Sequence, residues 1–313
     1  MEALVNIEGK PLEKLIDVVS KGIGAWCAPW QMRRLAKAEA DANFIKTIGE
    51  AKTQAILNGD ISRAATLEQV NSRIIYSEVK RQHNINQVVS YAALDYETKH
   101  SVSSKEVDDD WITRYFSIVQ DISTAEMQIL WGKILSGETA SPGTYSLRTL
   151  ELLRNLTKNE AELFVKYCQF VLRGGSHLFV PQDVSHGYDK FELQYTDIMT
   201  LIDIGLIIPS STTKITCSKK NAGTIEHSYF EYGKSLAVRV DLPENINNIH
   251  LSINMLSGVG TELYELIEIK PDIDYLRYFA SIIKKCGNVS VSYATITDKV
   301  GDAIRFQEPM VEL

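Results

Sequence analysis

Acidic, basic and imidazole side chains lie close together in one short segment, where Glu78, Lys80 and His83 could serve a metal-dependent nuclease. Such enzymes set an acidic residue and a lysine on neighbouring strand positions, so that both reach one metal-bound phosphate. The surrounding residues instead have helical periodicity, which points these three side chains in different directions. We therefore expect no catalytic site here, and the sequence assigns no catalytic residue elsewhere.

Three consecutive carboxylates, Asp108, Asp109 and Asp110, precede Trp111 and a predicted helix. A run of this kind could hold a divalent cation, but negative charge is also favoured at a helix N-terminus, and this second interpretation is preferred. Zinc sites favour clustered cysteines such as a Cys-x-x-Cys pair. The four cysteines of this chain lie far apart and form no such pair. We predict neither a metal nor a cofactor. These cysteines are Cys27, Cys168, Cys217 and Cys286.

Sequence signatures of the common nucleotide-binding and hydrolytic sites are absent from the chain. The nearest approach to a phosphate-binding loop is Gly258-Val259-Gly260 before a predicted helix. A turn between a strand and a helix explains these glycines more simply than an anion site. His177 and His186 could meet in space, but no orienting partner or substrate proton can be named for either of them.

The composition is that of a folded and acidic protein. The chain has 313 residues, 44% of them hydrophobic, and a net charge of −7. Residues 1–114 carry 15 Lys and Arg against 16 Asp and Glu, which leaves 18 against 24 in residues 115–313. Intrinsic disorder is therefore excluded for most of the length. The excess of carboxylates also argues against a protein that coats nucleic acid.

The elements of the N-terminal part are predicted to be long helices, at residues 11–24, 30–57 and 62–99. No proline or glycine interrupts the last of these, and its apolar spacing is not a strict heptad. Both features favour an antiparallel helical hairpin or an oligomer interface. We predict that a partner or a second copy contacts this helix through its apolar stripe: Leu67, Val70, Ile74, Ile85 and Val88.

The first amphipathic segment has a second interpretation as a membrane-surface helix. Trp26 and Trp30 would lie at the lipid interface, with Arg33 and Arg34 just beyond them. Lysines and carboxylates are mixed on the polar side, which weakens attraction to anionic lipid. Packing against protein is therefore preferred. The start of the sequence has no secretory signal pattern, so we expect a cytoplasmic protein, with peripheral contact at the inner membrane as the alternative.

The rest of the chain is predicted as a central helical unit over residues 107–175 and an α+β module over 176–313, after an N-terminal arm over 1–106. In the module, a helix at 195–203 stops at Gly205 and is followed by strands, which is the layout of a winged helix. Its helix contains no Lys or Arg, whereas recognition helices normally offer basic or amide side chains. Lys214, Lys219 and Lys220 are the candidate nucleic-acid contacts, and DNA binding is disfavoured.

A resemblance to a known family rests on residues 126–138, Glu-Met-Gln-Ile-Leu-Trp-Gly-Lys-Ile-Leu-Ser-Gly-Glu, and on residues 141–150, Ser-Pro-Gly-Thr-Tyr-Ser-Leu-Arg-Thr-Leu. These segments resemble a bacterial family described only as domain of unknown function 2806. The family supplies no catalytic residues that could be carried over. Similar proteins labelled as abortive-infection proteins are associated with antiviral loci, and the resemblance therefore implies a role in defence.

The residue types in this motif indicate structural roles. Trp131 and Leu135 suit a helix core, Gly137 suits a helix C-cap, and Arg148 could pair with Glu138 or Glu151. The overall expectation is an α-rich α+β protein without enzymatic activity. It would act in bacterial antiviral defence through a protein partner or as a homo-oligomer. A nucleic-acid-binding regulator and a membrane-associated effector acting through residues 11–30 are the alternatives.

Overall fold

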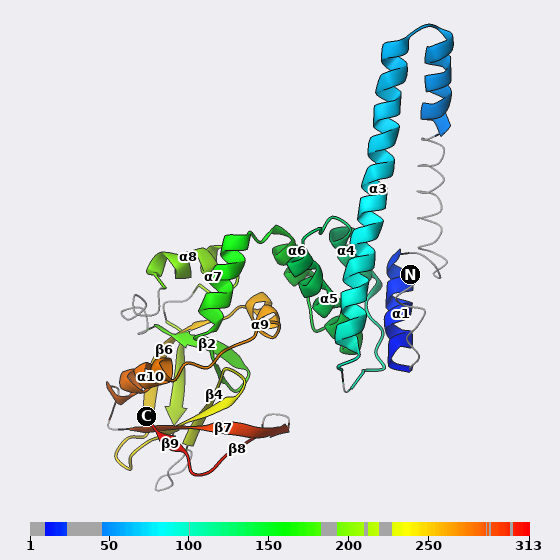
Figure 1. The fold of residues 1–313 in the computed structure, drawn as a ribbon. Coiled ribbons are helices and arrows are strands. Elements are labelled where there is room, and N and C mark those ends of the chain that lie inside the picture. The colour runs from blue at the N-terminus through cyan, green and yellow to red at the C-terminus, as the bar shows by residue number, and fades with distance from the viewer. Residues whose placement is uncertain are drawn as a thin grey trace. The chain divides into compact units, whose positions relative to one another are not determined.

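The computed structural model describes residues 10–23, 46–99, 101–182, 193–209, 212–218, 227–285, 287, 289–300 and 303–313. They form two compact units, Met1–Arg154 and Asn155–Leu313, drawn in Figure 1. The division falls at Arg154, whereas the predicted boundaries lie at residues 106 and 175. Residues 155–175 lie in the second unit because they contain a strand of its sheet.

The first unit contains the first and third of the expected helices and the end of the second, whose residues 30–45 lie outside the described residues. Helix α1 spans Lys10–Ile23, residues 46–57 are helical, and α3 spans Ile61–Tyr96. Gly59, with φ +73°, reverses the chain between the last two, and the Asp60 carboxylate accepts a hydrogen bond from the Arg63 amide at 3.0 Å. Residues 46–57 run back along the distal half of α3 as an antiparallel hairpin (Figure 1), and Lys52 pairs with Glu68 across it.

The proximal half of α3 packs into a helical core with α4 (Asp109–Val119), α5 (Ala125–Ala140) and α6 (Leu147–Asn155). Trp131 and Tyr115 are fully buried at its centre, and the Tyr115 hydroxyl donates to the Trp131 carbonyl at 2.7 Å. Helices α3 and α5 approach closely at Gly132, where an added Cβ would lie 2.7 Å from Cβ of Tyr91. A glycine is needed there because any larger residue would push the two helices apart.

The predicted roles of two motif residues are wrong. Gly137 is not a C-cap, because α5 continues to Ala140, and its missing side chain instead makes room for the Tyr145 ring. Arg148 is not the partner that holds the following turn. The buried Glu138 carboxylate accepts hydrogen bonds from the amides of Gly143 and Tyr145, at 2.6 and 2.8 Å, and Glu151 pairs with Arg114.

The second unit is built on one nine-stranded antiparallel sheet, in the order β3-β6-β2-β1-β4-β5-β7-β8, with β9 also paired to β7. The strands are β1 Leu172–Gly174, β2 His177–Pro181, β3 Lys214–Ser218, β4 His227–Tyr232, β5 Leu236–Asp241, β6 Asn248–Met255, β7 Ser290–Val300, β8 Ala303–Phe306 and β9 Val311–Glu312. The helices are α7 Lys158–Cys168, α8 Tyr195–Asp203, α9 Gly258–Tyr264 and α10 Ile273–Lys285.

The core of this unit lies between the sheet and its helices. Phe279 of α10 packs edge-on against Phe230 of β4, and Tyr275 of the same helix contacts the ring of Tyr232. The predicted α+β architecture is thus confirmed. Thr157 and Glu160 form a capping box at the start of α7.

The strand pairing differs from a winged helix. That layout requires the two strands after the recognition helix to form a hairpin. Here β3, which follows α8, pairs with β6, while β4 pairs with β1 and β5. The apolar residues of β3 and β6 pack together despite the 29 residues between the strands, so tertiary packing overrides the local hairpin signal.

Candidate interaction surface

The predicted interface residues divide into two groups. Ile85 and Val88 are 5% and 0% exposed, so they belong to the core of the first unit and are not a docking surface. Leu67, Val70 and Ile74 are half-buried in the distal part of α3. The residues of this one apolar stripe lie in two environments. The proximal half of the helix packs against α5, whereas the distal half extends into the hairpin.

Other apolar side chains on the distal half of α3 are strongly exposed. Ile75, Tyr76 and Val79 are 50%, 71% and 66% exposed. Residues four apart on a helix lie on one side, so Ile75 and Val79 are neighbours and Tyr76 lies beside them. Ile75 and Val79 belong to the apolar pattern of α3 in the sequence. Only the packing in the structure shows that these two side chains remain exposed to solvent.

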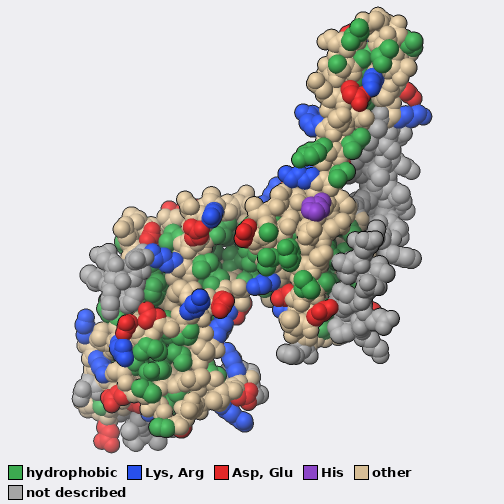
Figure 2. Space-filling view, in the orientation of Figure 1, with side chains coloured by type: hydrophobic (Ala, Val, Ile, Leu, Met, Phe, Trp, Pro, Cys, Tyr) green, Lys and Arg blue, Asp and Glu red, His purple; other side chains and the backbone are tan. Residues whose placement is uncertain are grey.

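The side of α3 that points away from its packed side has a distinct composition. At 100° per residue, eight positions between residues 69 and 87 fall within an arc of about 120°, and seven of them are classed as exposed. We call them the outward face: Gln69, Ser72, Arg73, Tyr76, Val79, Lys80, His83 and Gln87. This face contains no Asp or Glu. Figure 2 shows hydrophobic, basic and histidine side chains along the viewed side of the hairpin, with acidic side chains near its tip.

The carboxylates of this part of α3 lie off the outward face. Glu78 pairs with Arg81 at 2.8 Å, and Arg81 also reaches Asp121 at 3.1 Å. These hydrogen bonds to carboxylates raise the pKa of the Arg81 guanidinium. Arg73 and Lys80 form no ion pair with the residues that the structure describes. No described residue therefore neutralises the positive charge of the outward face.

The candidate nucleic-acid and membrane contacts are only partly described. Lys214 is exposed on β3, while Lys219 and Lys220 lie outside the described residues. Trp26 and Trp30 also lie outside them. In the part of the chain that is described, no helix is both long and apolar enough to cross a bilayer.

The structure gives the acidic run before α4 a capping role. The Asp108 carboxylate accepts a hydrogen bond from the Trp111 amide at 2.9 Å, and Asp109 and Asp110 occupy the first turn of α4. In the described ranges, no three His, Cys, Asp or Glu side chains come together as metal ligands. His83 and His177 are exposed on different units, and His186 lies outside the described residues.

Of the two glycines in the first turn of α9, Gly258 and Gly260, the second serves packing. The Ser257 hydroxyl caps this helix by accepting from the Gly260 amide at 3.0 Å. An added Cβ at Gly260 would lie 2.2 Å from the Leu206 carbonyl oxygen. Gly260 is therefore required for the close approach of α9 to the segment after α8, as in the predicted strand-to-helix turn.

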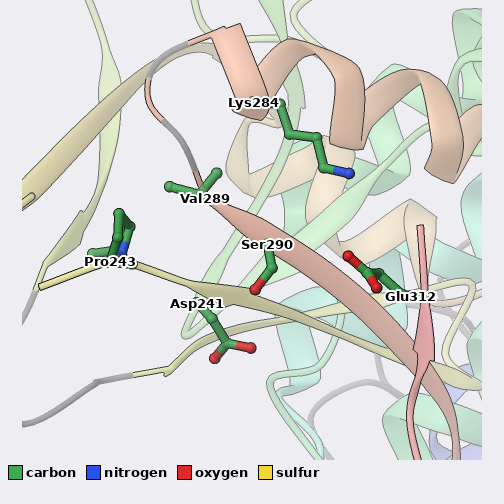
Figure 3. Close-up of a pocket in the computed structure, with 7 residues that line it drawn as sticks. Asp241, Pro243, Lys284, Val289, Ser290 and Glu312 are labelled. Atoms are coloured by element: carbon green, nitrogen blue, oxygen red, sulfur yellow. The ribbon is translucent and has the colours of Figure 1, made fainter.

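A pocket of about 420 Å³ opens between β5, α10 and β7. Figure 3 shows Lys284 reaching from α10 toward the side where Ser290 and Glu312 lie. The Lys284 ammonium donates to the Leu313 carbonyl at 2.7 Å, and Asp241 pairs with Arg239 at 3.0 Å. Lys284 and Asp241 therefore already have partners within the protein.

A network of charges lies beside β1 and β4. Glu231 is 6% exposed and its carboxylate accepts from the Lys299 ammonium at 2.6 Å, with Arg173 Nε at 3.9 Å. Arg173 also binds Glu265. Burial raises the pKa of the nearby Cys168 thiol, which keeps it protonated and a poor nucleophile. Lys299 and Arg173 thus offset the charge of the buried Glu231 carboxylate, which would be left buried and uncompensated without them.

Together these features define an α+β protein with a helical hairpin and an exposed, carboxylate-free helix face. The family model for proteins of unknown function DUF2806 matches residues 68–280, and the chain belongs to that family. The match includes most of α3, the helical core and most of the second unit. No curated protein and no solved structure matches the chain significantly.

Proposed function

We propose that this chain is a non-enzymatic protein that acts by binding another protein molecule through the distal half of α3. The observation that carries the proposal is the exposure of Ile75, Tyr76 and Val79 on one helix. Scattered apolar residues are normal on protein surfaces, but three adjacent ones beside a basic side chain have the composition of an interface core.

The geometry of the helical hairpin supports this proposal. α3 has 36 residues, about 54 Å at 1.5 Å per residue. Its buried residues, apart from Ala64, lie between Asn84 and Tyr96, so more than half of its length extends beyond the core. A long helix whose distal half contributes little to the core is suited to presenting a surface there, either to a second copy or to a different protein.

We further propose that this binding serves bacterial antiviral defence of the abortive-infection type. The support is the similarity of residues 126–150 to proteins associated with such loci. In this proposal the second unit is a structural or protein-binding module.

The experiment compares two double variants in a host that lacks the chromosomal gene. Ile75→Glu with Val79→Glu places charge on the exposed apolar pair, and Ile129→Glu with Val165→Glu is the matched control at two other exposed apolar positions. Protection against phage, measured as plating efficiency, should be lost with the first variant and kept with the control. Equal protection by both variants would refute the proposed role of α3.

A second measurement addresses self-association. Light scattering coupled to size-exclusion chromatography gives the molar mass of the wild-type protein and of the Ile75→Glu, Val79→Glu variant. A mass above 35.2 kDa that falls to this value in the variant identifies a homo-oligomer. A wild-type mass of 35.2 kDa, that of a strict monomer, would rule out the oligomer form of the proposal.

A further inference from the structure

The outward face of α3 selects the kind of protein that can bind there. It contains Arg73 and Lys80 two helical turns apart, Tyr76 between them, His83 at the next turn, and no carboxylate. We infer that this face binds an acidic, amphipathic helix of a different protein. The inference rests on the proposed function, because it assumes that α3 is the contact surface and then specifies the partner.

A second copy of α3 does not fit this face. In an antiparallel pair centred between residues 76 and 77, Arg73 of one copy lies opposite Lys80 of the other. In a parallel pair in register, each cation lies opposite itself. Like charges brought together in an interface are repulsive and exclude wrong partners. A symmetric dimer through this face is therefore disfavoured.

Nucleic acid is also a poor match. Proteins that bind duplex DNA through its backbone neutralise about 6–10 phosphates with Lys and Arg. The outward face offers two such residues, Arg73 and Lys80, along about 27 Å of helix from Gln69 to Gln87. Most of the remaining contact area is Tyr76, Val79 and uncharged polar side chains, which suit a protein surface.

The chemistry that complements this face follows from its spacing. Arg73 and Lys80 are seven residues apart, about 10.5 Å along the axis. A partner helix with Asp or Glu at two positions seven apart can meet both cations. Apolar residues between those carboxylates would cover Tyr76 and Val79. Aromatic side chains such as Tyr76 are enriched at the centres of interfaces of this type.

The experiment uses the full-length protein in its host with a photo-crosslinking amino acid in place of Tyr76. Mass spectrometry identifies the cross-linked peptide, which is then synthesised for binding measurements. The expected peptide comes from another protein and has a net negative charge. Arg73→Glu with Lys80→Glu should weaken its binding about tenfold or more. Replacing the two facing carboxylates of the peptide by lysines should restore binding to this variant.

The matched control is Arg63→Glu with Lys133→Glu, which reverses two exposed cations of the same unit away from the outward face. It should change the affinity by less than twofold. A single-stranded 20-nucleotide DNA is tested in parallel, and binding that is lost in the Arg73, Lys80 variant would overturn the inference in favour of nucleic acid.

The outcomes separate this inference from the proposed function. A cross-link to a neutral or basic partner, or to a second copy, would overturn the inference and leave protein binding by α3 in place. A cross-link within this chain itself, residues 24–45 included, would refute the inference and the proposed function together. Absence of any cross-linked protein, from Tyr76 and from Val79 replaced in the same way, would refute both.

Discussion

At the scale of single residues, the polar groups that look chemical in the sequence are held by structural contacts. Asp108 caps a helix, Glu138 binds two backbone amides, and Cys168 is a buried thiol. The capping role of Asp108 could be predicted because the residues involved are adjacent. The role of Glu138 could not, because it depends on how the turn after α5 folds back.

Lys234 links a tight turn to the end of a helix. Gly233 and Lys234, with φ of 59° and 61°, form the turn between β4 and β5. The Lys234 ammonium lies 3.0 Å from the Glu265 carbonyl and 3.3 Å from the carbonyls of Tyr264 and Ile267, at the C-terminus of α9. A cation at this end of a helix stabilises its unsatisfied carbonyls.

Lys234→Met should therefore lower the free energy of unfolding by about 1–2 kcal/mol, because charged hydrogen bonds to the helix end are lost. Lys234→Gly should cost less than Lys234→Met, since glycine accepts the left-handed backbone. Lys270→Met is the control at an exposed lysine. Urea denaturation provides the comparison, and equal stability of the Lys234 and Lys270 methionine variants would contradict the assigned contact.

The Tyr232 phenol makes the stability sensitive to alkaline pH. Burial raises its pKa to about 12, whereas an unfolded tyrosine titrates near 10. The hydroxyl donates to the Gln169 carbonyl at 2.9 Å and accepts from the Asp272 amide at 3.1 Å. The folded state thus keeps a proton that the unfolded state releases.

This stabilisation is fully present below pH 10 and is lost as the pH rises from 10 through 12, by about 2–3 kcal/mol in total. Tyr232→Phe should be less stable at pH 7, since its hydrogen bonds are lost. It should also show a shallower decline between pH 10 and 12, by up to one proton. Urea unfolding at several pH values tests this, and an unchanged slope would disprove the assignment.

At the scale of elements, the helices were predictable because each carries its own periodicity, caps and glycine stops. α1 and α3 begin within one residue of the predicted helices. Strand partners were not predictable, since β3 pairs with β6 through contacts 29 or more residues away. The outward face of α3 was missed for a related reason. The helical pattern reports which residues are apolar, but not which of them a neighbouring helix covers.

Replacement by alanine should have opposite effects at two glycines of the first unit, because only one of them lies at the contact between α3 and α5. Gly132→Ala should lower the free energy of unfolding by about 1–3 kcal/mol, because its Cβ would lie 2.9 Å from the Ala92 amide nitrogen. Gly49→Ala, in the helix at residues 46–57 with no atom within 4 Å, should be neutral or stabilising by up to about 1 kcal/mol. Thermal unfolding measures both, and similar effects at the two sites would contradict the packing.

At the scale of the whole molecule, the chain consists of two units that each contain their own core. The helical core around Trp131 lies within residues 1–154, and the sheet with α10 lies within residues 155–313. Acidic charge is concentrated after residue 114, while the outward face of α3 is free of it. A net charge of −7 is therefore an average over surfaces of different character.

Because each core is self-contained, residues 155–313 should fold when expressed alone. The expected result is a cooperative thermal transition followed by circular dichroism, with near-ultraviolet signals from the packed tyrosines. The intact chain with Gly132→Ala should lose stability in one transition and keep the second unchanged. A fragment without cooperative unfolding would show that the second unit depends on the first.

Because α3 is uninterrupted, it should also keep the residues along it at fixed distances from one another. No glycine or proline lies between Ile61 and Tyr96, so the helix has no residue at which it is expected to kink. Spin labels at the exposed positions Ala65 and Leu94 would be separated by about 44 Å along the axis. A narrow distribution of this distance would show that the spacing between the outward face and the helical core is constant in solution.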